Sequence, residues 1–315
     1  MDMFIATILG ILAAGSPLVL ASLGETISER AGVVNLSLDG AMLLSAMAAF
    51  ALALTTGSAW LGFLFGGLTG AAVAGFLVVV SVYLGCSQMA IGFILTLLCR
   101  DLAYFLGNDY ARLPGPDLGY WSIPGLGGIS PVVYVSVIAM FLVWRWMFFT
   151  RSGLRARAVG ESPQAAFSRG VKVNRIRILC VLTGGFMAGL AGGAYSLAIK
   201  NGWGRPQGCE GAGWICLAIV IFGGWSPWKV VAGAYFFAAL QVAGIHLQDL
   251  FPGLPGPVFQ VAPFPIMILT LLLANLGRMR RVKDLAARNP FVKKIVSGLN
   301  ASAPEALGKD FNEDM

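Results

Sequence analysis

The chain is 315 residues long, 57% hydrophobic and only 12% charged, with a mean hydropathy of +0.78. Soluble domains carry about 25% charged residues, so this composition excludes a soluble globular protein and indicates an integral protein of a lipid bilayer. The net charge of +7 does not indicate binding to nucleic acid, because most basic residues gather at 151–177 and 278–309, beside apolar segments.

Apolar segments recur along the chain at the length that a membrane crossing needs, about 20 residues for ~30 Å of hydrocarbon. They predict an all-α, polytopic transmembrane helical bundle of about nine spans (eight to ten) over residues 1–276, followed by a tail over 277–315. The expected spans are 3–23, 38–55, 59–84, 89–107, 131–149, 178–199, 211–224, 228–247 and 258–276. The seventh is short, which favours a tilted or re-entrant segment.

Two polar, glycine-containing breaks interrupt this pattern. We interpret 24–44 as the first cytoplasmic loop, and its part 24–37 as a candidate re-entrant segment, because polar residues can enter a membrane where they line a cavity. The second break is 205–215. Asp39-Gly40-Ala41 and Glu210-Gly211-Ala212 each open an apolar run, a pairing that internal repeats in transporters produce. Two three-residue matches are too short to decide whether the chain contains an internal repeat.

Arg100 and Asp101 fall in the middle of the fourth expected span. Ionisable side chains at this depth are costly and are usually paired or turned toward a polar cavity. Neighbouring residues of a helix point about 100° apart, so the two are not expected to pair with each other. Either each pairs with a polar group on another helix, or they form a cavity wall.

The basic stretch 150–177 is expected to contain a short helix. Ser162 can cap the first free N–H groups and Pro163 suits the first helical position, while Gly170 suits a left-handed stop. The helix between them, 163–169, is about two turns long and needs a surface to dock on. Its apolar face would come from Ala165, Ala166 and Phe167. It is either a docking helix or a solvated basic loop that obeys the positive-inside rule.

Both basic segments are expected to face the cytoplasm. This orientation puts the N-terminus outside and the C-terminus inside, with a loosely ordered tail. The loops near 113–130 and 246–260 would lie outside. The sequence has no GxxxxGK[ST], HExxH, CxxC or GxSxG pattern, a lone histidine (His246) and five cysteines in mostly apolar runs. We therefore expect no enzyme chemistry, no metal site and no cofactor bound by this chain.

Three blocks resemble a known family. GETISERAGVVNLSLDGAMLLSA (24–46) resembles the signature of permease subunits of bacterial ABC importers for simple sugars and nucleosides. The blocks 153–197 and 219–238 are similar to later parts of the same family, in the same order. The resemblance implies the shorter member of a permease pair in the bacterial plasma membrane. Its implied partners are a longer permease, a cytoplasmic ATPase with two nucleotide-binding lobes that holds ATP and Mg, and an extracytoplasmic substrate-binding lipoprotein.

The resemblance also implies roles for residues. Segment 160–170 would be the helix that couples to the ATPase, through Gly160, Glu161, Ser162, Pro163, Ala165, Ala166, Phe167 and Gly170. Asn35, Asp39 and Gln88 match polar positions of the family pattern and are candidates for the substrate path.

Other path candidates come from residue chemistry alone. Arg100, Asp101 and Glu210 are ionisable residues in or beside expected spans, and Phe93 and Trp214 are candidate aromatic contacts for a base.

The chain departs from the family pattern at Ser37 and Asp39, where Gly and Glu are usual, at Arg169, and at 100–101. The last departure puts purine nucleosides in doubt as the substrate. The alternative function is an ATP-independent secondary transporter that uses intramembrane Asp39, Asp101 and Glu210. A further rival is a membrane enzyme that uses acids in the bilayer, but the acids are scattered.

Overall fold

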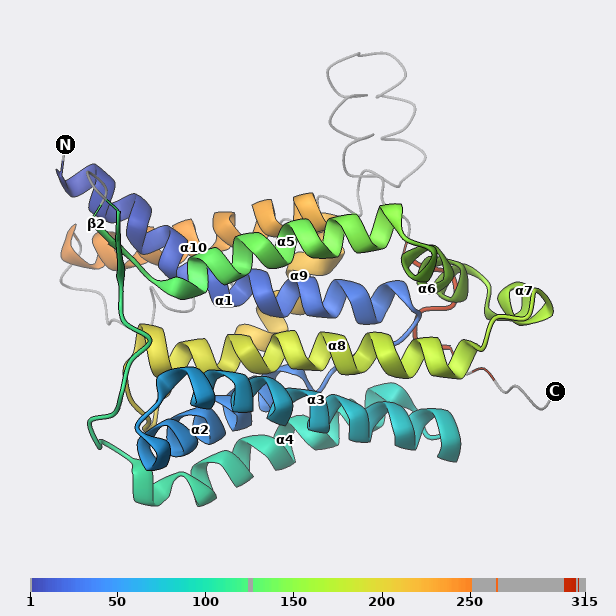
Figure 1. Ribbon diagram of the computed structural model, residues 1–315, viewed down its shortest axis with the longest axis horizontal. Coiled ribbons are helices and arrows are strands. Elements are labelled where there is room, and N and C mark those ends of the chain that lie inside the picture. Colours follow the sequence, from blue (N-terminus) through green and yellow to red (C-terminus); the bar gives the residue numbers. More distant parts are fainter. Residues whose placement is uncertain (1, 124–126, 251–264, 266–302, 310, 312–315) are drawn as a thin grey trace, which may run out of the picture.

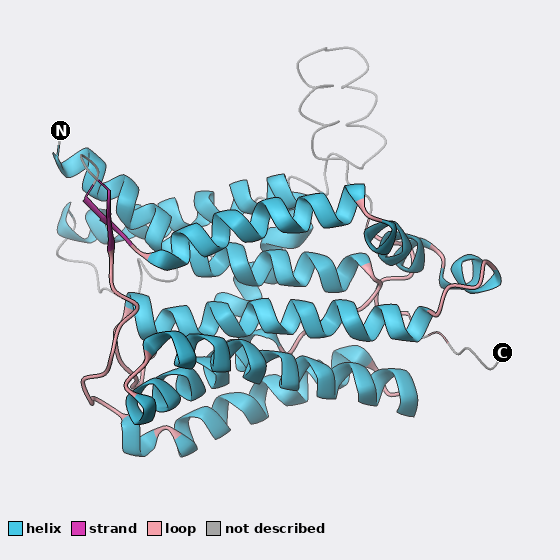
Figure 2. Cartoon of the chain, in the orientation of Figure 1, coloured by secondary structure: helices cyan, strands magenta, loops and turns pink. Residues whose placement is uncertain are grey.

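The computed structural model describes residues 2–123, 127–250, 265, 303–309 and 311. It confirms the predicted all-α polytopic bundle (Figure 1; Figure 2). The α-helices are α1 (Asp2–Arg30), α2 (Leu38–Thr56), α3 (Ala59–Leu84), α4 (Gln88–Leu106), α5 (Pro131–Phe149), α6 (Arg151–Glu161), α7 (Pro163–Ser168), α8 (Val173–Ala194), α9 (Ala212–Gly223) and α10 (Pro227–Leu250). A 3-10 turn, η1 (Asn108–Tyr110), follows α4, and a π-helical turn, η2 (Tyr195–Ile199), prolongs α8.

A small hairpin was not expected from the sequence. β1 (Trp121–Ile123) pairs antiparallel with β2 (Gly127–Ile129), with Trp121 opposite Ile129. The hairpin lies at the end of the bundle where α1 begins, which we call the hairpin end (Figure 2). Helices α6 and α7 lie at the opposite end, which we call the α7 end.

Among the described residues, six helices are long and apolar enough to cross a membrane: α1, α2, α3, α4, α5 and α8 with η2. Helix α9 is apolar but has only 12 residues, which agrees with the expectation of a short seventh segment. Helix α10 runs for 24 residues and corresponds to the eighth. The ninth expected span, 258–276, lies outside the described residues except for position 265.

Helix α8 forms the centre of the bundle and packs against α1, α2 and α3 (Figure 1). Glycines set the helix separation. A Cβ added at Gly24 of α1 would lie 2.5 Å from the carbonyl oxygen of Gly184, and one at Gly70 of α3 would lie 2.6 Å from the Cα of Gly189. These crossings need residues without side chains, as is common where membrane helices pack closely.

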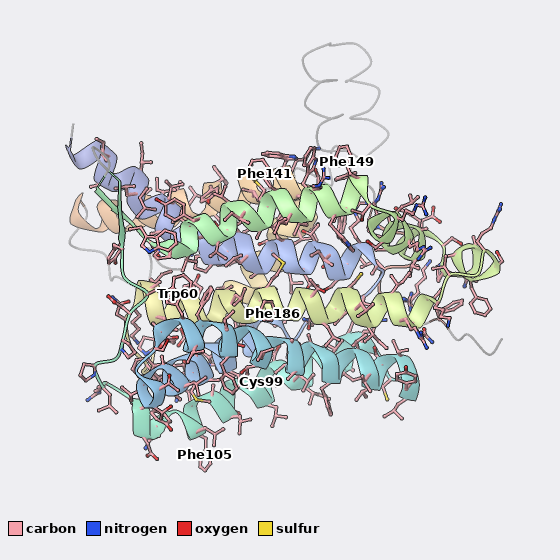
Figure 3. All side chains as sticks on the ribbon, in the orientation of Figure 1. Trp60, Cys99, Phe105, Phe141, Phe149 and Phe186 are labelled. Atoms are coloured by element: carbon pink, nitrogen blue, oxygen red, sulfur yellow. The ribbon has the colours of Figure 1, made fainter. Side chains whose placement is uncertain are left out.

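Large apolar side chains cover the outer surface of the bundle. Phe105, Phe141 and Phe149 are 79%, 49% and 65% exposed, and Figure 3 shows Phe105 and Phe141 on opposite outer faces. Such a surface suits contact with lipid or with another membrane subunit, since exposing this much apolar area to water would be unfavourable.

The expected loop 24–44 is wrong. Residues 24–30 are the last two turns of α1, and α2 already begins at Leu38, so the true break is 31–37. The polar side chains that favoured a loop are buried and bonded inside the bundle. The Glu25 carboxylate accepts the backbone N–H of Asn35 at 2.9 Å, and the Glu29 carboxylate accepts the indole N–H of Trp225. From the sequence alone, buried polar residues of this kind look like loop residues, because their hydrogen-bond partners lie elsewhere in the chain.

Two further expectations are corrected at the α7 end. The basic stretch contains a second helix, α6, before the predicted one. The described part of the tail, 303–309 and 311, is not loosely ordered but packs against α6 and the start of the 31–37 connection. The rest of the tail lies outside the described residues.

Candidate functional site

Two irregular connections enter the bundle from opposite ends. The connection 31–37 follows α1 at the α7 end. The connection 200–211 follows η2 at the hairpin end, where Leu118 N–H donates to Leu197 at 3.0 Å and Arg112 N–H donates to Trp203 at 3.0 Å. Each connection leads into the N-terminus of a helix, α2 in the first case and α9 in the second.

The two helix N-termini meet inside the bundle. The backbone N–H of Gly213 in α9 donates to the Asp39 carboxylate in α2 at 3.0 Å. A Cβ at Gly213 would lie well inside 3.0 Å of the Asp39 backbone nitrogen, so only glycine fits. The tripeptides 39–41 and 210–212, which the sequence suggested as counterparts, therefore lie side by side. The carboxylate sits where the positive end of α9 favours negative charge.

Side chains of α1 and α4 hold the 31–37 connection. Besides the Glu25 bond, the Gln88 side-chain oxygen accepts Val34 N–H at 3.2 Å, and the Thr96 hydroxyl donates to the Leu36 carbonyl at 2.6 Å. These bonds replace the helical hydrogen bonds that the break removes, as buried backbone requires. Gln88, a candidate path residue, is thus also a support of the connection.

Asn35 has an unused donor. The residue is 1% exposed, and its Oδ1 accepts the backbone N–H and the hydroxyl of Ser37 at 3.1 and 2.5 Å. Its Nδ2 is buried and has no hydrogen-bond partner among the described residues. A buried donor of this kind costs about 1–3 kcal/mol, so Asn35 is well suited to bind a ligand oxygen that enters the bundle.

Glu210 organises the connection 200–211. One carboxylate oxygen accepts Gln207 N–H at 2.6 Å and the Tyr104 hydroxyl, and the other accepts Gly208 N–H at 2.6 Å. Partial burial opposes ionisation, but these hydrogen bonds outweigh it and lower the pKa of Glu210 below its ordinary value. The carboxylate is therefore a fixed negative charge.

A charged and aromatic cluster surrounds the meeting point. The charges of Arg100 and Glu210 both act on the Asp39 carboxylate. The Arg205 guanidinium lies 4.9 Å from the centre of the Tyr104 ring, whose other neighbour is the Trp203 ring at 5.7 Å. Arg100 itself is exposed on α4, so its link to this cluster is electrostatic rather than a direct contact.

Other sequence candidates lie outside this cluster. Phe93 is 51% exposed on the outer face of α4, and Asp101 is also exposed. Trp214 is half-buried and packs against the core. Tyr104 belongs to the cluster but was missed, although it lies one turn after Arg100 and could have been found from that i, i+4 spacing.

The predicted short helix is present as α7. The Ser162 hydroxyl accepts Ala165 N–H at 3.4 Å, and Pro163 is the first helical residue. At the other end Gly170 has φ +77, and the bonds Gly170 N–H to Phe167 and Val171 N–H to Ala166 close a Schellman motif. The start and stop residues are as predicted.

The outer face of α7 differs from the expected one. Phe167 is 45% exposed and Ala165 is exposed. Ala166, however, is 5% exposed and packs inward against Val159 and Val173. Ala166 therefore supports the helix from beneath, and the surface open to another protein carries Phe167.

Arg30, at the end of α1, joins this region to the α9–α10 turn. Its Nη1 lies 3.8 Å from the Glu161 carboxylate, and its Nε donates to the Trp225 carbonyl at 3.1 Å. Trp225 has φ +55, which is uncommon for a residue with a side chain. Gly160 fits closely beside Arg30, because a Cβ there would lie well inside 3.0 Å of the Arg30 carbonyl oxygen. Sequence reasoning gave no role to Arg30, although it lies in the block 24–46, or to Trp225.

No group of three or more His, Cys, Asp or Glu side chains that could hold a metal ion occurs in the described part of the chain. The five cysteines are free thiols, of which Cys86 alone is exposed. The cluster offers hydrogen bonds and ring faces, which suit reversible binding of a polar molecule.

Comparisons with known proteins identify the family of the chain. Residues 7–271 match the family described as the permease component of the branched-chain amino acid transport system. The chain is 36% identical to the "Putative glucose ABC transporter permease protein" of Haloferax volcanii, over 96% of both chains. It is 32% identical to a nucleoside ABC transporter permease protein of Lactococcus lactis subsp. cremoris, over 82% of this chain and 88% of the relative. It is 31% identical to a guanosine ABC transporter permease protein of Bacillus subtilis, over 81% and 88%. No solved structure matches.

Proposed function

Because the chain belongs to the family of permease components of the branched-chain amino acid transport system, we propose that it is a pore-forming permease subunit of an ATP-driven importer. With a second, longer permease it would enclose the path for a nucleoside or a simple sugar. A partner ATPase would bind ATP and Mg, and an extracytoplasmic binding protein would deliver the substrate. This chain itself would bind no cofactor and catalyse no reaction.

A continuous series of contacts from α7 to Asp39 carries the proposal. Glu161, next to α7, is paired with Arg30, and Arg30 is bonded to Trp225 at the end of α9. Helix α9 is a rod of 12 residues, about 18 Å long, and its other end is bonded to Asp39 through Gly213. A push on α7 can therefore reach the meeting point of α2 and α9.

The α7 end would face the cytoplasm. Helix α6, the loop after α7 and the start of α8 carry Arg151, Arg155, Arg157, Arg169, Lys172 and Arg175, which fits the positive-inside rule. The hairpin end and the N-terminus would then lie outside. A plasma-membrane location follows from the same proposal.

The substrate class rests on the relatives named for nucleosides, guanosine and glucose. Sugar hydroxyls would bind to Asn35 and Asp39, which offer an unused donor and a carboxylate. An aromatic base, where present, could stack on a ring such as that of Tyr104. Movement of α9 would change the distance between these groups, and with it the population of inward-open and outward-open states.

Reconstitution tests the assignment. The chain, the second permease and the ATPase are placed in proteoliposomes with ATP on the ATPase side, and uptake of radiolabelled nucleosides and glucose is measured. Phe167→Ala should reduce uptake and ATPase capture, whereas Phe141→Ala, an equal truncation on the outer face of α5, should not. Uptake by this chain alone in ATP-free vesicles would instead establish a secondary transporter.

A further inference from the structure

The C-terminal segment forms a strap across the α7 end. The strap, residues 303–309 with Phe311, makes two tight turns, with Leu307 N–H donating to Pro304 and Lys309 N–H to Ala306, both at 3.1 Å. It lies next to the last turns of α1 and α6, where Figure 1 shows the red trace. The strap is therefore a defined structure.

Two backbone hydrogen bonds fix the strap to the bundle. Ala306 N–H donates to the Gly160 carbonyl at 2.9 Å, and Gly308 N–H donates to the Gly32 carbonyl at 3.0 Å. The first bond satisfies a carbonyl at the end of α6, where no helical partner remains. The second reaches the start of the 31–37 connection. The strap thus ties α6 to the segment that carries Asn35.

The fit at this point is close. Ala306 is 4% exposed, and its carbonyl oxygen would lie 3.2 Å from a Cβ at Gly32. Gly308 has φ +70, and the Met89 side chain at the start of α4 lies 3.4 Å from where its Cβ would be. Only glycine reaches this conformation cheaply. The strap consequently contacts α4 as well as α6 and the 31–37 connection.

Beyond this anchor the strap reaches α7. The Phe311 ring packs edge-on against the Phe167 ring, with centroids 5.9 Å apart and an interplanar angle of 61°. Phe311 also packs on the small apolar cluster of Val159, Ala166 and Val173 beneath α7. Phe167 nevertheless stays 45% exposed. The two rings therefore form one apolar patch that is still open.

We propose that the strap completes the surface on which the ATPase subunit docks, and that it links this surface directly to the 31–37 connection. This proposal rests on the proposed function. Phe167 and Phe311 would enter the same apolar pocket of the partner. Exposed Arg169, Lys172 and Lys309 lie near them in the chain, so the pocket should have an acidic rim.

A lid that must leave before docking is the other use of such a segment. A lid would cover Phe167. The Phe311 ring instead contacts the Phe167 ring edge-on, and Phe167 stays nearly half exposed. A lid would also be held weakly. The strap has a buried alanine and two backbone bonds to separate elements, which suits a permanent part of the surface.

The test measures ATPase binding to the assembled permease pair in nanodiscs, by titration with the purified ATPase subunit. Phe311→Ala should weaken binding about tenfold, as expected when an aromatic anchor of an interface is removed. Phe141→Ala, the same truncation on the outer face of α5, should leave binding unchanged. Phe167→Ala combined with Phe311→Ala should weaken binding by less than the product of the single effects, because the rings share a pocket.

A second variant tests the anchor. Gly308→Val places a side chain at φ +70 and should release the strap, with weaker ATPase binding and less uptake. Glu305→Val, on an exposed strap position, is the control, and capture of the second permease checks assembly of each variant. Unchanged binding by Phe311→Ala, or tighter binding as a released lid would give, overturns the proposal. If Phe167→Ala still weakens binding in that case, the proposed function stands without the strap.

Discussion

The backbone N–H of Gly213 donates to the carboxylate of Asp39 at 3.0 Å, although 174 positions separate the two residues. The bond joins the first turn of α9 to the first turn of α2. Each of these helices follows an irregular connection that starts from a different end of the bundle. A single movement at this contact can therefore change both breaks.

Gly213→Ala should separate the two helices. The new methyl group would lie well inside 3.0 Å of the Asp39 backbone nitrogen, and overpacking of a close helix contact costs about 1–3 kcal/mol. We expect a lower thermal unfolding temperature in detergent and strongly reduced uptake. Gly10→Ala in α1 is the control, since among the described residues no atom beyond its own helix turn lies within 4 Å of its Cβ position. Equal unfolding temperatures for both variants would contradict the close contact.

Asp39→Asn should keep the helix contact but lose the charge. The asparagine oxygen can still accept Gly213 N–H, so the protein should assemble with its second permease. Uptake should fall at least tenfold if the carboxylate binds a substrate hydroxyl, because hydrogen bonds to charged groups contribute about 1.5–3 kcal/mol. Measuring uptake against substrate concentration separates weaker binding from a slower step. Wild-type uptake would remove Asp39 from the path.

Much of the fold could be predicted from hydrophobicity and helix signals. The spans 59–84 and 131–149 match α3 and α5, because their sequences are long, apolar and bounded by Gly, Ser or Pro. The start and stop of α7 were equally readable, since Ser162, Pro163 and Gly170 act through local backbone geometry. Such signals depend only on neighbouring residues.

The errors arose where distant partners decide the outcome. Glu25 and Glu29 look like loop residues, but they are buried because Asn35 and Trp225 bond to them. The strap lies in a tail whose composition is largely polar after Pro290, and its order depends on two carbonyls at Gly32 and Gly160. For the same reason the sequence suggested 39–41 and 210–212 as counterparts, but it could not predict that they lie side by side. It also could not predict that the Tyr104 hydroxyl bonds to Glu210.

Arg30→Gln should uncouple the two ends of the series of contacts. The variant loses the guanidinium group, and with it both the ion pair to Glu161 and the hydrogen bond to the Trp225 carbonyl. Glutamine keeps part of the side-chain volume. We expect the ATPase to bind with near wild-type affinity but to drive less uptake for each ATP hydrolysed. The measurement is the ratio of transported substrate to released phosphate in proteoliposomes.

Arg112→Gln is the matched control for Arg30→Gln. It makes the same change of charge on an exposed residue at the hairpin end, far from α7. Its ratio of transport to hydrolysis should equal that of the wild type. An unchanged ratio in Arg30→Gln as well would show that force reaches α9 by another route.

Glu210→Gln should change how the stability of the protein depends on pH. Because hydrogen bonds lower the pKa of Glu210 in the folded protein, its ionised form stabilises the fold above the ordinary carboxyl range. That stabilisation is lost as the pH falls through the lowered pKa. The wild type should therefore unfold at a higher temperature than the variant at pH 7, and the difference should shrink as the pH falls below the ordinary carboxyl range. Thermal unfolding of both proteins from pH 8 down to about pH 3 measures it, with Asp109→Asn, an exposed carboxyl change at the same end, as control. A difference that grows toward acid pH would mean that the Tyr104 hydroxyl and the Gln207 and Gly208 N–H groups do not hold the carboxylate in its ionised form.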